Sequence, residues 1–403
     1  MQALDGLDCF KVRIYGLVKR VSCRDIQNLI IGEAKYVGNP VKRDSMRKTV
    51  VFALVVIVAI VCLSLISFGP YLFPKEEEFR RSRLPAIHIQ GNRILDENGN
   101  QITFRGVNSV GVGEMIYYYE KWSEEYFEKM KDWNVKIVRF PIHYASYKWF
   151  EENQPRFFLK SLDQGIEWAA RNGIYSIIDF HSCGWPVTGE YFGGGYDSNW
   201  GRNIYEFTPE ELKDFWDKIS AYFANDTRIA FYDLFNEPAK DDPNIGGVGD
   251  DISLEAWLEW RTFAEELIDI IRENDPNRVV LVGGLQFSYY VNHAVDYPVR
   301  RPNVVYSVHI YNNTNWMVSW DEALGNASSH IPVLVGEVGF DPDDPNIGGT
   351  VENFASPLLD YLEEKGIGWL AWNFGPEWSP KLLLDWNYTP TVAGEFFYEK
   401  LHS

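Results

Sequence analysis

Cysteine is scarce in this chain, and its distribution limits what the protein can contain. Three of the four cysteines, Cys9, Cys23 and Cys62, lie near the N-terminus, and only Cys183 lies in the long remainder. A disulfide within that remainder is therefore excluded, and no spacing of cysteine or histidine typical of a metal site is present. The sequence predicts no metal and no cofactor.

Positive charge is also scarce beyond the N-terminal part. The chain has 38 Lys and Arg against 57 Asp and Glu, a net charge of −19. Residues 1–74 hold 10 basic and 5 acidic groups, which leaves 28 basic and 52 acidic groups in residues 75–403. Such an acidic surface disfavours nucleic acid and anionic lipid as partners and is compatible with a neutral polymer. All 15 tryptophans follow residue 121, and exposed indoles suit the apolar faces of sugar rings.

One apolar run near the N-terminus is long enough to cross a membrane. No charged residue occurs from Thr49 to Pro74, and four basic residues, Lys42, Arg43, Arg47 and Lys48, precede the run. About 20 apolar residues span a bilayer, and basic residues stay on the cytoplasmic side. We expect a single-pass membrane protein whose large C-terminal domain is extracellular, and the alternative is secretion after signal cleavage. The predicted parts are a short cytoplasmic tail or over-extended start (1–48), a transmembrane signal-anchor (49–73), a linker (74–85) and the large domain (86–403).

The large domain (86–403) shows an alternation of strand-like and helix-like segments. Turn signals at Gly91-Asn92 and Asn98-Gly99 first mark a short hairpin. A helix is clearest at Leu254–Asn274, and another opens with a capping box at Thr208–Glu211. Eight alternations of strand and helix predict a (β/α)8 TIM barrel. The alternative, a doubly wound open sheet, would normally have a glycine-rich turn after its first strand, and the sequence shows none. The strand-like segments are Ile102–Asn108, Val135–Ile142, Tyr175–His181, Ile229–Asn236, Arg278–Gly283, Val304–Tyr311, Pro332–Glu337 and Gly368–Phe374.

Two glutamates lie at the C-terminal tips of predicted strands. Glu237 follows Phe235-Asn236 and precedes Pro238, and Glu337 ends the run that begins at Val333. Cleavage of a glycosidic bond needs one carboxyl group to protonate the leaving oxygen and a second to meet the sugar carbon. Other predicted tips carry polar or aromatic residues as well: Arg139, His181, Asn236, His309, Tyr311 and Trp372.

This set of tips closely resembles the motif pattern of glycoside hydrolase family 5, the retaining cellulase family of clan A, over about Ile87 to Leu401. The resemblance implies Glu237 as acid/base and Glu337 as nucleophile. It implies that Arg139 and Tyr311 keep Glu337 ionised and that Asn236 binds the sugar 2-hydroxyl. His181, His309 and Trp372 would line the same subsite. Loop tryptophans that we expect at further sugar subsites are Trp185, Trp200, Trp316 and Trp378.

From this resemblance we expect a retaining endo-β-1,4-glucanase that acts on β-linked polysaccharide or oligosaccharide. The alternatives are a β-mannanase or another β-glycanase of the family and, less readily, a non-catalytic carbohydrate-binding membrane protein. A retaining mechanism predicts carboxyl groups about 5–5.5 Å apart.

A heptapeptide occurs twice, as Asp241–Gly247 and as Asp343–Gly349. Its residues are the usual turn formers, so we expect two similar turns, with a calcium site as the alternative. Each copy follows a tip glutamate within a few residues. The repeat predicts that both loops form rims of the substrate cleft.

Overall fold

The computed structural model describes residues 81–242, 247–312 and 318–403, which belong to a compact unit that begins at Arg81. The predicted tail and membrane span lie outside the described residues. Among those residues, no helix is long and apolar enough to cross a membrane.

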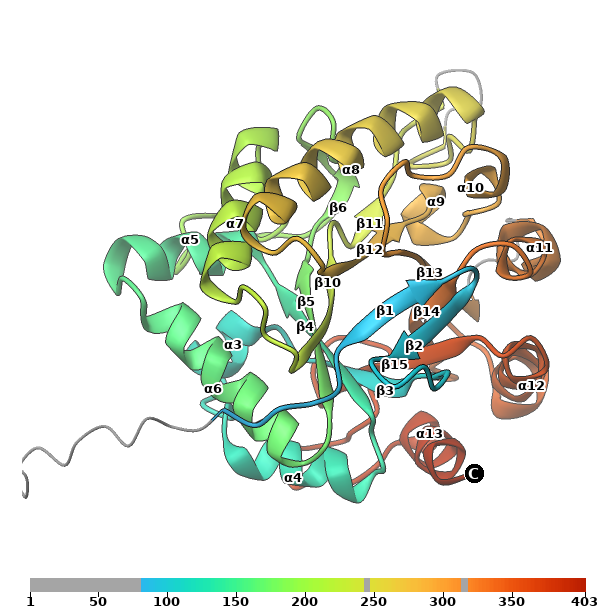
Figure 1. Ribbon diagram of the computed structural model, residues 1–403. Coiled ribbons are helices and arrows are strands. Elements are labelled where there is room, and N and C mark those ends of the chain that lie inside the picture. Colours follow the sequence, from blue (N-terminus) through green and yellow to red (C-terminus); the bar gives the residue numbers. More distant parts are fainter. Residues whose placement is uncertain (1–80, 243–246, 313–317) are drawn as a thin grey trace, which may run out of the picture. The chain divides into compact units, whose positions relative to one another are not determined.

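The unit is built on a closed barrel of eight parallel strands (Figure 1). Their order around the barrel is β10-β12-β13-β14-β15-β3-β4-β5, with β5 pairing back to β10. The strands confirm the predicted (β/α)8 alternation, with ends that shift by a few residues. They are β3 (Arg105–Ser109), β4 (Ile137–Ile142), β5 (Tyr175–Phe180), β10 (Ile229–Asp233), β12 (Val279–Gly283), β13 (Val304–Tyr311), β14 (Val333–Gly339) and β15 (Gly368–Phe374).

Helices surround the barrel because each carries an apolar face that packs on the strands (Figure 1). Helix α8 begins and ends where the periodicity predicts, and α7 starts with the predicted capping box between Thr208 and Glu211. The helical segments are α3 (Val112–Tyr117), α4 (Glu124–Asp132), α5 (Tyr144–Asn153), α6 (Phe157–Arg171), α7 (Pro209–Tyr222), α8 (Leu254–Asn274), α9 (Leu285–Ser288), α10 (His293–Asp296), η2 (Asp321–Gly325), α11 (Asn326–Ser328), η3 (Val351–Ala355), α12 (Ser356–Glu364) and α13 (Val392–His402).

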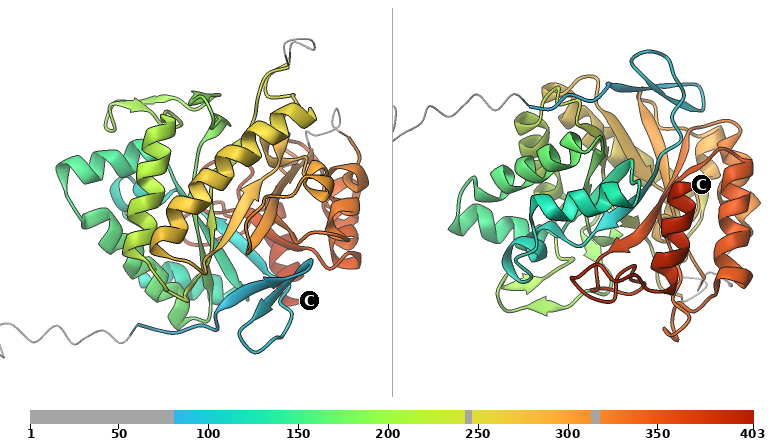
Figure 2. Two further views of the ribbon diagram at one scale, coloured as in Figure 1. Left: turned by 45° about the horizontal axis from the view of Figure 1, so that its top comes forward. Right: turned by 90° about the horizontal axis from the view of Figure 1, so that it is seen from below.

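The predicted hairpin closes the N-terminal end of the barrel. Strands β1 (Ile87–Gln90) and β2 (Arg93–Asp96) pair antiparallel, and Ile94 packs on the barrel's inner apolar layer. That layer is made by one inward residue from most strands: Ile137, Ile177, Phe231, Leu281, Val305, Leu334 and Leu370, with Phe104 just before β3. Figure 2 shows the hairpin at one end and the long loop after β5 at the other. The open end is therefore the C-terminal end of the strands.

Short strands outside the barrel order the loops at this open end. Strand β11 (Glu237–Pro238) pairs with β6 (Cys183–Trp185), which pairs with β7 (Glu190–Tyr191). Strands β8 (Tyr196–Asp197) and β9 (Arg202–Asn203) form a further pair. The sequence placed Glu237 at the end of a barrel strand, but β10 stops at Asp233. Glu237 instead belongs to this separate small sheet.

Candidate active site

The alternation of side chains along each strand explains which residues enter the barrel. Ile137 lies in the inner apolar layer, so Arg139, two residues later, points inward as well. The same step leads from Ile177 to Asp179 and from Phe231 to Asp233. A polar layer therefore lies directly above the apolar layer, and its members are fully buried.

Glu337 reaches the interior through an irregularity in β14. The pairing of β14 with β13 shifts register between Val308 and His309, and its pairing with β15 shifts between Val335 and Val338. Such bulges re-aim side chains near active sites. The shift makes Glu337 the direct neighbour of His309 across the two strands.

Arg139 is the hub of the polar layer. Its Nη1 donates to Oε1 of Glu337 at 2.8 Å, its Nε donates to Asp233 at 2.9 Å, and its Nη2 donates to Oδ1 of Asn236 at 2.8 Å. An ion pair at 3.0 Å joins Nη2 to Asp179. Because Arg139 fixes the Asn236 oxygen, the amide NH2 group of Asn236 is the part left for a ligand.

The two glutamates have different partners. Tyr311 donates its hydroxyl to Oε2 of Glu337 at 2.5 Å, whereas Nδ1 of His309 lies 3.0 Å from Oε1 of Glu237. The side chain of Glu237 is 20% exposed and that of Glu337 is 4% exposed. Carboxylate oxygens of the two glutamates and a ring nitrogen of His309 all lie within 4.8 Å of one another. Two carboxyl groups with oxygens this close can act together in a double displacement.

Burial raises the pKa of Glu237 to about 7, although the charge of Arg139 and a hydrogen bond from the Cys183 thiol oppose this. A carboxyl group with such a pKa holds a proton near neutral pH and can donate it. Burial also lowers the pKa of the His309 imidazole to about 4, so this ring is neutral there.

The resemblance implied that Arg139 and Tyr311 keep Glu337 ionised. Both contacts are present, and each lowers the pKa of Glu337 together with His309. Burial nevertheless outweighs them, and the pKa of Glu337 is raised from its ordinary value. The expectation concerned these two contacts, and both are present and act in the expected direction, although burial has the larger effect on the pKa.

A cavity of about 400 Å³ opens above these groups. Most of the predicted tip residues line it, and the ring of Trp372 stacks on His181 with 5.4 Å between ring centroids. His181 is fixed from below by Asp179, whose carboxylate lies 2.7 Å from Nδ1. The lining residues are His181, Tyr205, Asn236, Glu237, Phe287, Tyr289, His309, Tyr311, Glu337, Ile347, Trp372, Ser379 and Pro380.

The loop tryptophans divide into groups. Trp378 stacks parallel to Trp372 at 6.3 Å and remains partly exposed beside the cavity. Trp185 and Trp200 do not line the cavity and are 2% and 5% exposed, so neither offers a face to a sugar ring there. Trp185 carries Lys240 over its ring, and Trp200 packs among aromatic rings from α3 and α5. Trp316 lies outside the described residues.

Several cavity and support residues were not predicted from the sequence. Asp179 and Asp233 hold Arg139, and Tyr205 and Phe287 form cavity walls. A charged residue inside an otherwise apolar strand was the available signal for the two aspartates. The two aromatic residues come from long loops, where spacing carries no such signal.

The repeated heptapeptide forms turns in its described parts. In the second copy, Asp344 accepts backbone hydrogen bonds from Asn346 and Ile347, and Ile347 lines the cavity. In the first copy, Asp241 accepts from Gly249, while residues 243–246 lie outside the described part. Among the described residues, no group of three acidic side chains from these two loops converges on one point, and the calcium alternative stays untested. The rim prediction is thus met for the second loop.

Comparison with known proteins decides the family. The family model described as cellulase (glycosyl hydrolase family 5) matches residues 95–377. The chain belongs to glycosyl hydrolase family 5.

Relatives in the family are similar at modest identity. Endoglucanase A of Evansella cellulosilytica is 26% identical over 68% of this chain and 49% of its own length. Endoglucanase E-5 of Thermobifida fusca is 26% identical over 73% of this chain and 57% of its own length. The chain thus spans about half the length of these curated relatives. A crystal structure of a β-glucanase from Saccharophagus degradans with cellotetraose has 29% identity and a TM-score of 0.70, covering 80% of this chain and 94% of that one.

Proposed function

We propose that the protein is a retaining endo-β-1,4-glucanase. The observation that carries this proposal is the pair of glutamates with oxygens within 4.8 Å of each other at one cavity, where Tyr311 donates to Glu337 and His309 contacts Glu237. Substrate class follows from the relatives, which are endoglucanases and a β-glucanase solved with cellotetraose.

In the first step, Glu337 attacks the anomeric carbon and forms a glycosyl ester while Glu237 gives its proton to the departing oxygen. In the second step, Glu237 takes a proton from water, which attacks the same carbon and releases Glu337. Arg139 and Tyr311 donate to the two oxygens of Glu337 and stabilise the carboxylate that attacks and later departs. Asn236 would hold the sugar 2-hydroxyl, and Trp372 with Trp378 would stack on sugar rings.

Two measurements test this proposal. Purified enzyme is offered soluble cellulose, mixed-linkage glucan and mannan, and the anomer released first is read by NMR. We expect glucan cleavage with the β-anomer formed first; direct formation of the α-anomer would exclude the mechanism, and a preference for mannan would exclude the substrate.

The nucleophile has its own test. Glu337→Gly is expected to lose hydrolysis of natural polymer, while azide restores turnover of an activated aryl β-cellobioside and yields an α-glycosyl azide. The same variant of Glu237 would instead give a β-glycosyl azide. Azide products of the opposite assignment would exchange the two roles.

We also propose, from the uncharged run Thr49–Pro74 and the basic residues before it, that the enzyme is tethered with its catalytic domain outside the cell. Protease added to intact cells should release active enzyme by cutting in the linker. Activity already free in the medium would favour signal cleavage.

A further inference from the structure

Cys183 lies directly beside Glu237 in the small sheet of the open end. The register of the parallel pair β6 and β11 sets Glu237 opposite Cys183. Side chains of paired residues point to the same face of a sheet, so the thiol and the carboxyl group are neighbours. Cys183 is 6% exposed and is the only cysteine between residues 81 and 403.

The backbone around Cys183 leaves little freedom to move. The amide of Glu237 donates to Ser182 at 3.1 Å, and the amide of Phe192 donates to Cys183 from the other side at 2.8 Å. The next residue, Gly184, has a φ of +141°, and a side chain there would meet the carbonyl oxygen of Glu190 at 2.2 Å. The thiol is therefore presented to Glu237 from a fixed position.

The thiol and the Glu237 carboxyl group lie on paired residues and interact electrostatically, and the thiol lowers the pKa of Glu237. Burial raises the pKa of the Cys183 thiol well above its usual range, and the carboxyl group of Glu237 raises it further. The thiol therefore keeps its proton at all working pH values and acts as the donor, with the carboxylate as acceptor.

We propose that Cys183 is a positioning residue for the proposed acid/base: its thiol and the His309 ring hold the Glu237 carboxyl group between them, turned toward the cavity. This inference rests on the proposed function of Glu237. Contact from His309 comes from barrel strand β13, and contact from Cys183 comes from the loop sheet, so the two supports are independent elements of the fold.

A hydrogen-bond donor aimed at a carboxylate favours its ionised form. Cys183 thus limits how far burial raises the pKa of Glu237. Because the proton on Glu237 sets the basic limb of the pH–activity profile, a change in the strength of the donor at position 183 should move that limb. Other charged or titratable groups that interact with Glu237 are Arg139, Asp179, Tyr205, His309, Tyr311 and Glu337. Cys183 also interacts with Tyr205 and Glu337, so the test compares opposite changes in donor strength at this one position.

The test compares Cys183→Ser and Cys183→Ala in the full-length chain, with kcat/KM for an aryl β-cellobioside measured against pH. The hydroxyl of serine is a stronger donor, so we expect the basic limb to move down by about 0.5–1 pH unit. Alanine removes the donor, so we expect the basic limb to move up by a similar amount. Ser182→Ala is the matched control, because Ser182 is the adjacent buried residue and donates to the Tyr205 carbonyl instead.

Opposite shifts with an unmoved Ser182→Ala control support the proposal. The proposal is overturned if both variants shift the basic limb in the same direction, or if Cys183→Ser shifts it upward or not at all. Serine is nearly isosteric with cysteine, so this variant decides the matter even if the alanine variant does not fold. Failure of the proposed function looks different. In that case Glu237→Gln would keep the wild-type basic limb, whatever the cysteine variants do.

Discussion

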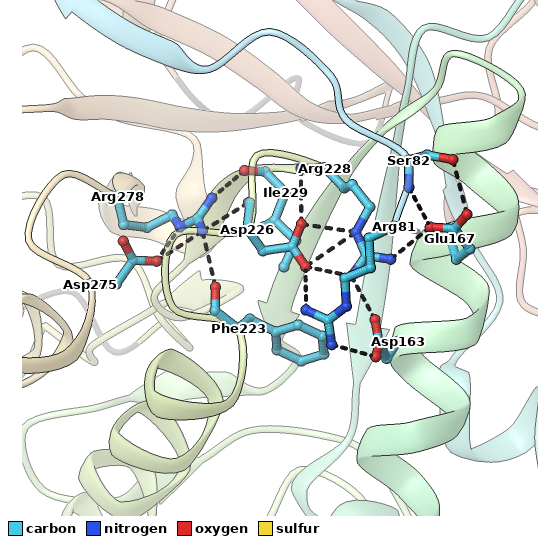
Figure 3. Close-up of polar contacts among 10 residues, drawn as sticks. All are labelled: Arg81, Ser82, Asp163, Glu167, Phe223, Asp226, Arg228, Ile229, Asp275 and Arg278. Atoms are coloured by element: carbon cyan, nitrogen blue, oxygen red, sulfur yellow. Dashed lines mark hydrogen bonds and ion pairs between the residues drawn. The ribbon is translucent and has the colours of Figure 1, made fainter. Parts of the chain in front are cut away.

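Two buried arginines lie at opposite ends of the barrel. The pKa values of the carboxyl groups around them are shifted in opposite directions. Arg139 lies among the polar residues below the cavity, and Arg228 lies at the N-terminal end of β10 (Figure 3). Both side chains are almost fully buried, at 0% and 1% exposed. Sequence and burial alone would not tell them apart.

Around Arg139, carboxylates outnumber cations. One guanidinium contacts Asp179, Asp233 and Glu337, and Glu237 lies close by. Burial raises the pKa of both aspartates and of both glutamates, and the single arginine does not compensate. This end of the barrel therefore holds groups that take up and release protons near neutral pH.

Around Arg228, the numbers of acids and cations are closer to equal. Arg228 forms ion pairs with Asp163, Glu167 and Asp226 (Figure 3). Arg81 forms a further ion pair with Asp163. Arg278 pairs with Asp275 and donates a hydrogen bond to the carbonyl oxygen of Asp226. Burial again opposes ionisation of Asp226 and Glu167, but hydrogen bonds from Arg228 to Asp226 and from Ser82 to Glu167 outweigh it, and both pKa values are lowered. These acids stay ionised and hold the entering segment Arg81–Ser82 on the barrel. The ratio of acids to cations, more than burial, separates the reactive end from the structural end.

Arg139→Met is the substitution with the largest expected effect on activity. It removes the donor to Glu337 and the group that orients Asn236, so we expect kcat/KM on soluble cellulose to fall by about 10³-fold or more. Circular dichroism is the control for folding. Activity within tenfold of wild type would show that Arg139 is only structural.

Arg228→Met should lower stability and leave activity unchanged. It leaves the buried acids Glu167 and Asp226 without their main cation, so we expect the free energy of unfolding to fall by about 3–5 kcal/mol, read from denaturant titration. The kcat of the folded fraction should equal that of wild type. A change in kcat at full folding would contradict the separation of the two ends.

The two ends should also fail on opposite sides of neutral pH. Glu237 must be protonated to act as acid, and burial raises its pKa to about 7, so kcat/KM should fall about tenfold per pH unit above that value. The lowered pKa of Asp226 means that its contribution to stability is fully present at neutral pH. That contribution is lost on acidification, beginning near the ordinary aspartate value of 3.8. Thermal melting and initial rates across pH 3–9 measure both; stability lost above pH 7 with activity retained would reverse the assignment.

Ser82→Ala should have the smallest effect. Its backbone amide and hydroxyl donate to Glu167 at 3.0 and 2.9 Å, and only the hydroxyl bond is removed. We expect a loss of about 1 kcal/mol in the free energy of unfolding and no change in kcat/KM. An effect on activity from this distant position would mean that the two ends are coupled.

Much of this architecture could be predicted from the sequence, because strand periodicity is local. The segments Val304–Tyr311 and Gly368–Phe374 were predicted with the bounds that the structure gives, and the tip residues of these strands do line one cavity. The bulge that turns Glu337 inward was not visible, since it depends on pairing with two neighbouring strands.

Contacts between segments that are distant in the chain could not be predicted from the sequence. Pairing of Cys183 with Glu237 joins two loops across 54 residues, and Glu167 meets Arg228 from another element. Trp185 was expected at a sugar subsite but is buried, because a loop tryptophan has no periodicity that reveals its exposure. The position of Trp185 in the sequence predicted that it lies near the site but could not predict which way its ring points.

The most direct measurement is covalent trapping of the intermediate. Wild-type enzyme is incubated with 2-deoxy-2-fluoro-β-cellobiosyl fluoride, digested, and mapped by mass spectrometry, with Glu337→Gln as the control. We predict one added fluorocellobiosyl group on the peptide that contains Glu337 and none in the variant. An adduct on another residue, or no adduct together with direct release of the α-anomer from oligosaccharide, would contradict the assignment of Glu337 as nucleophile.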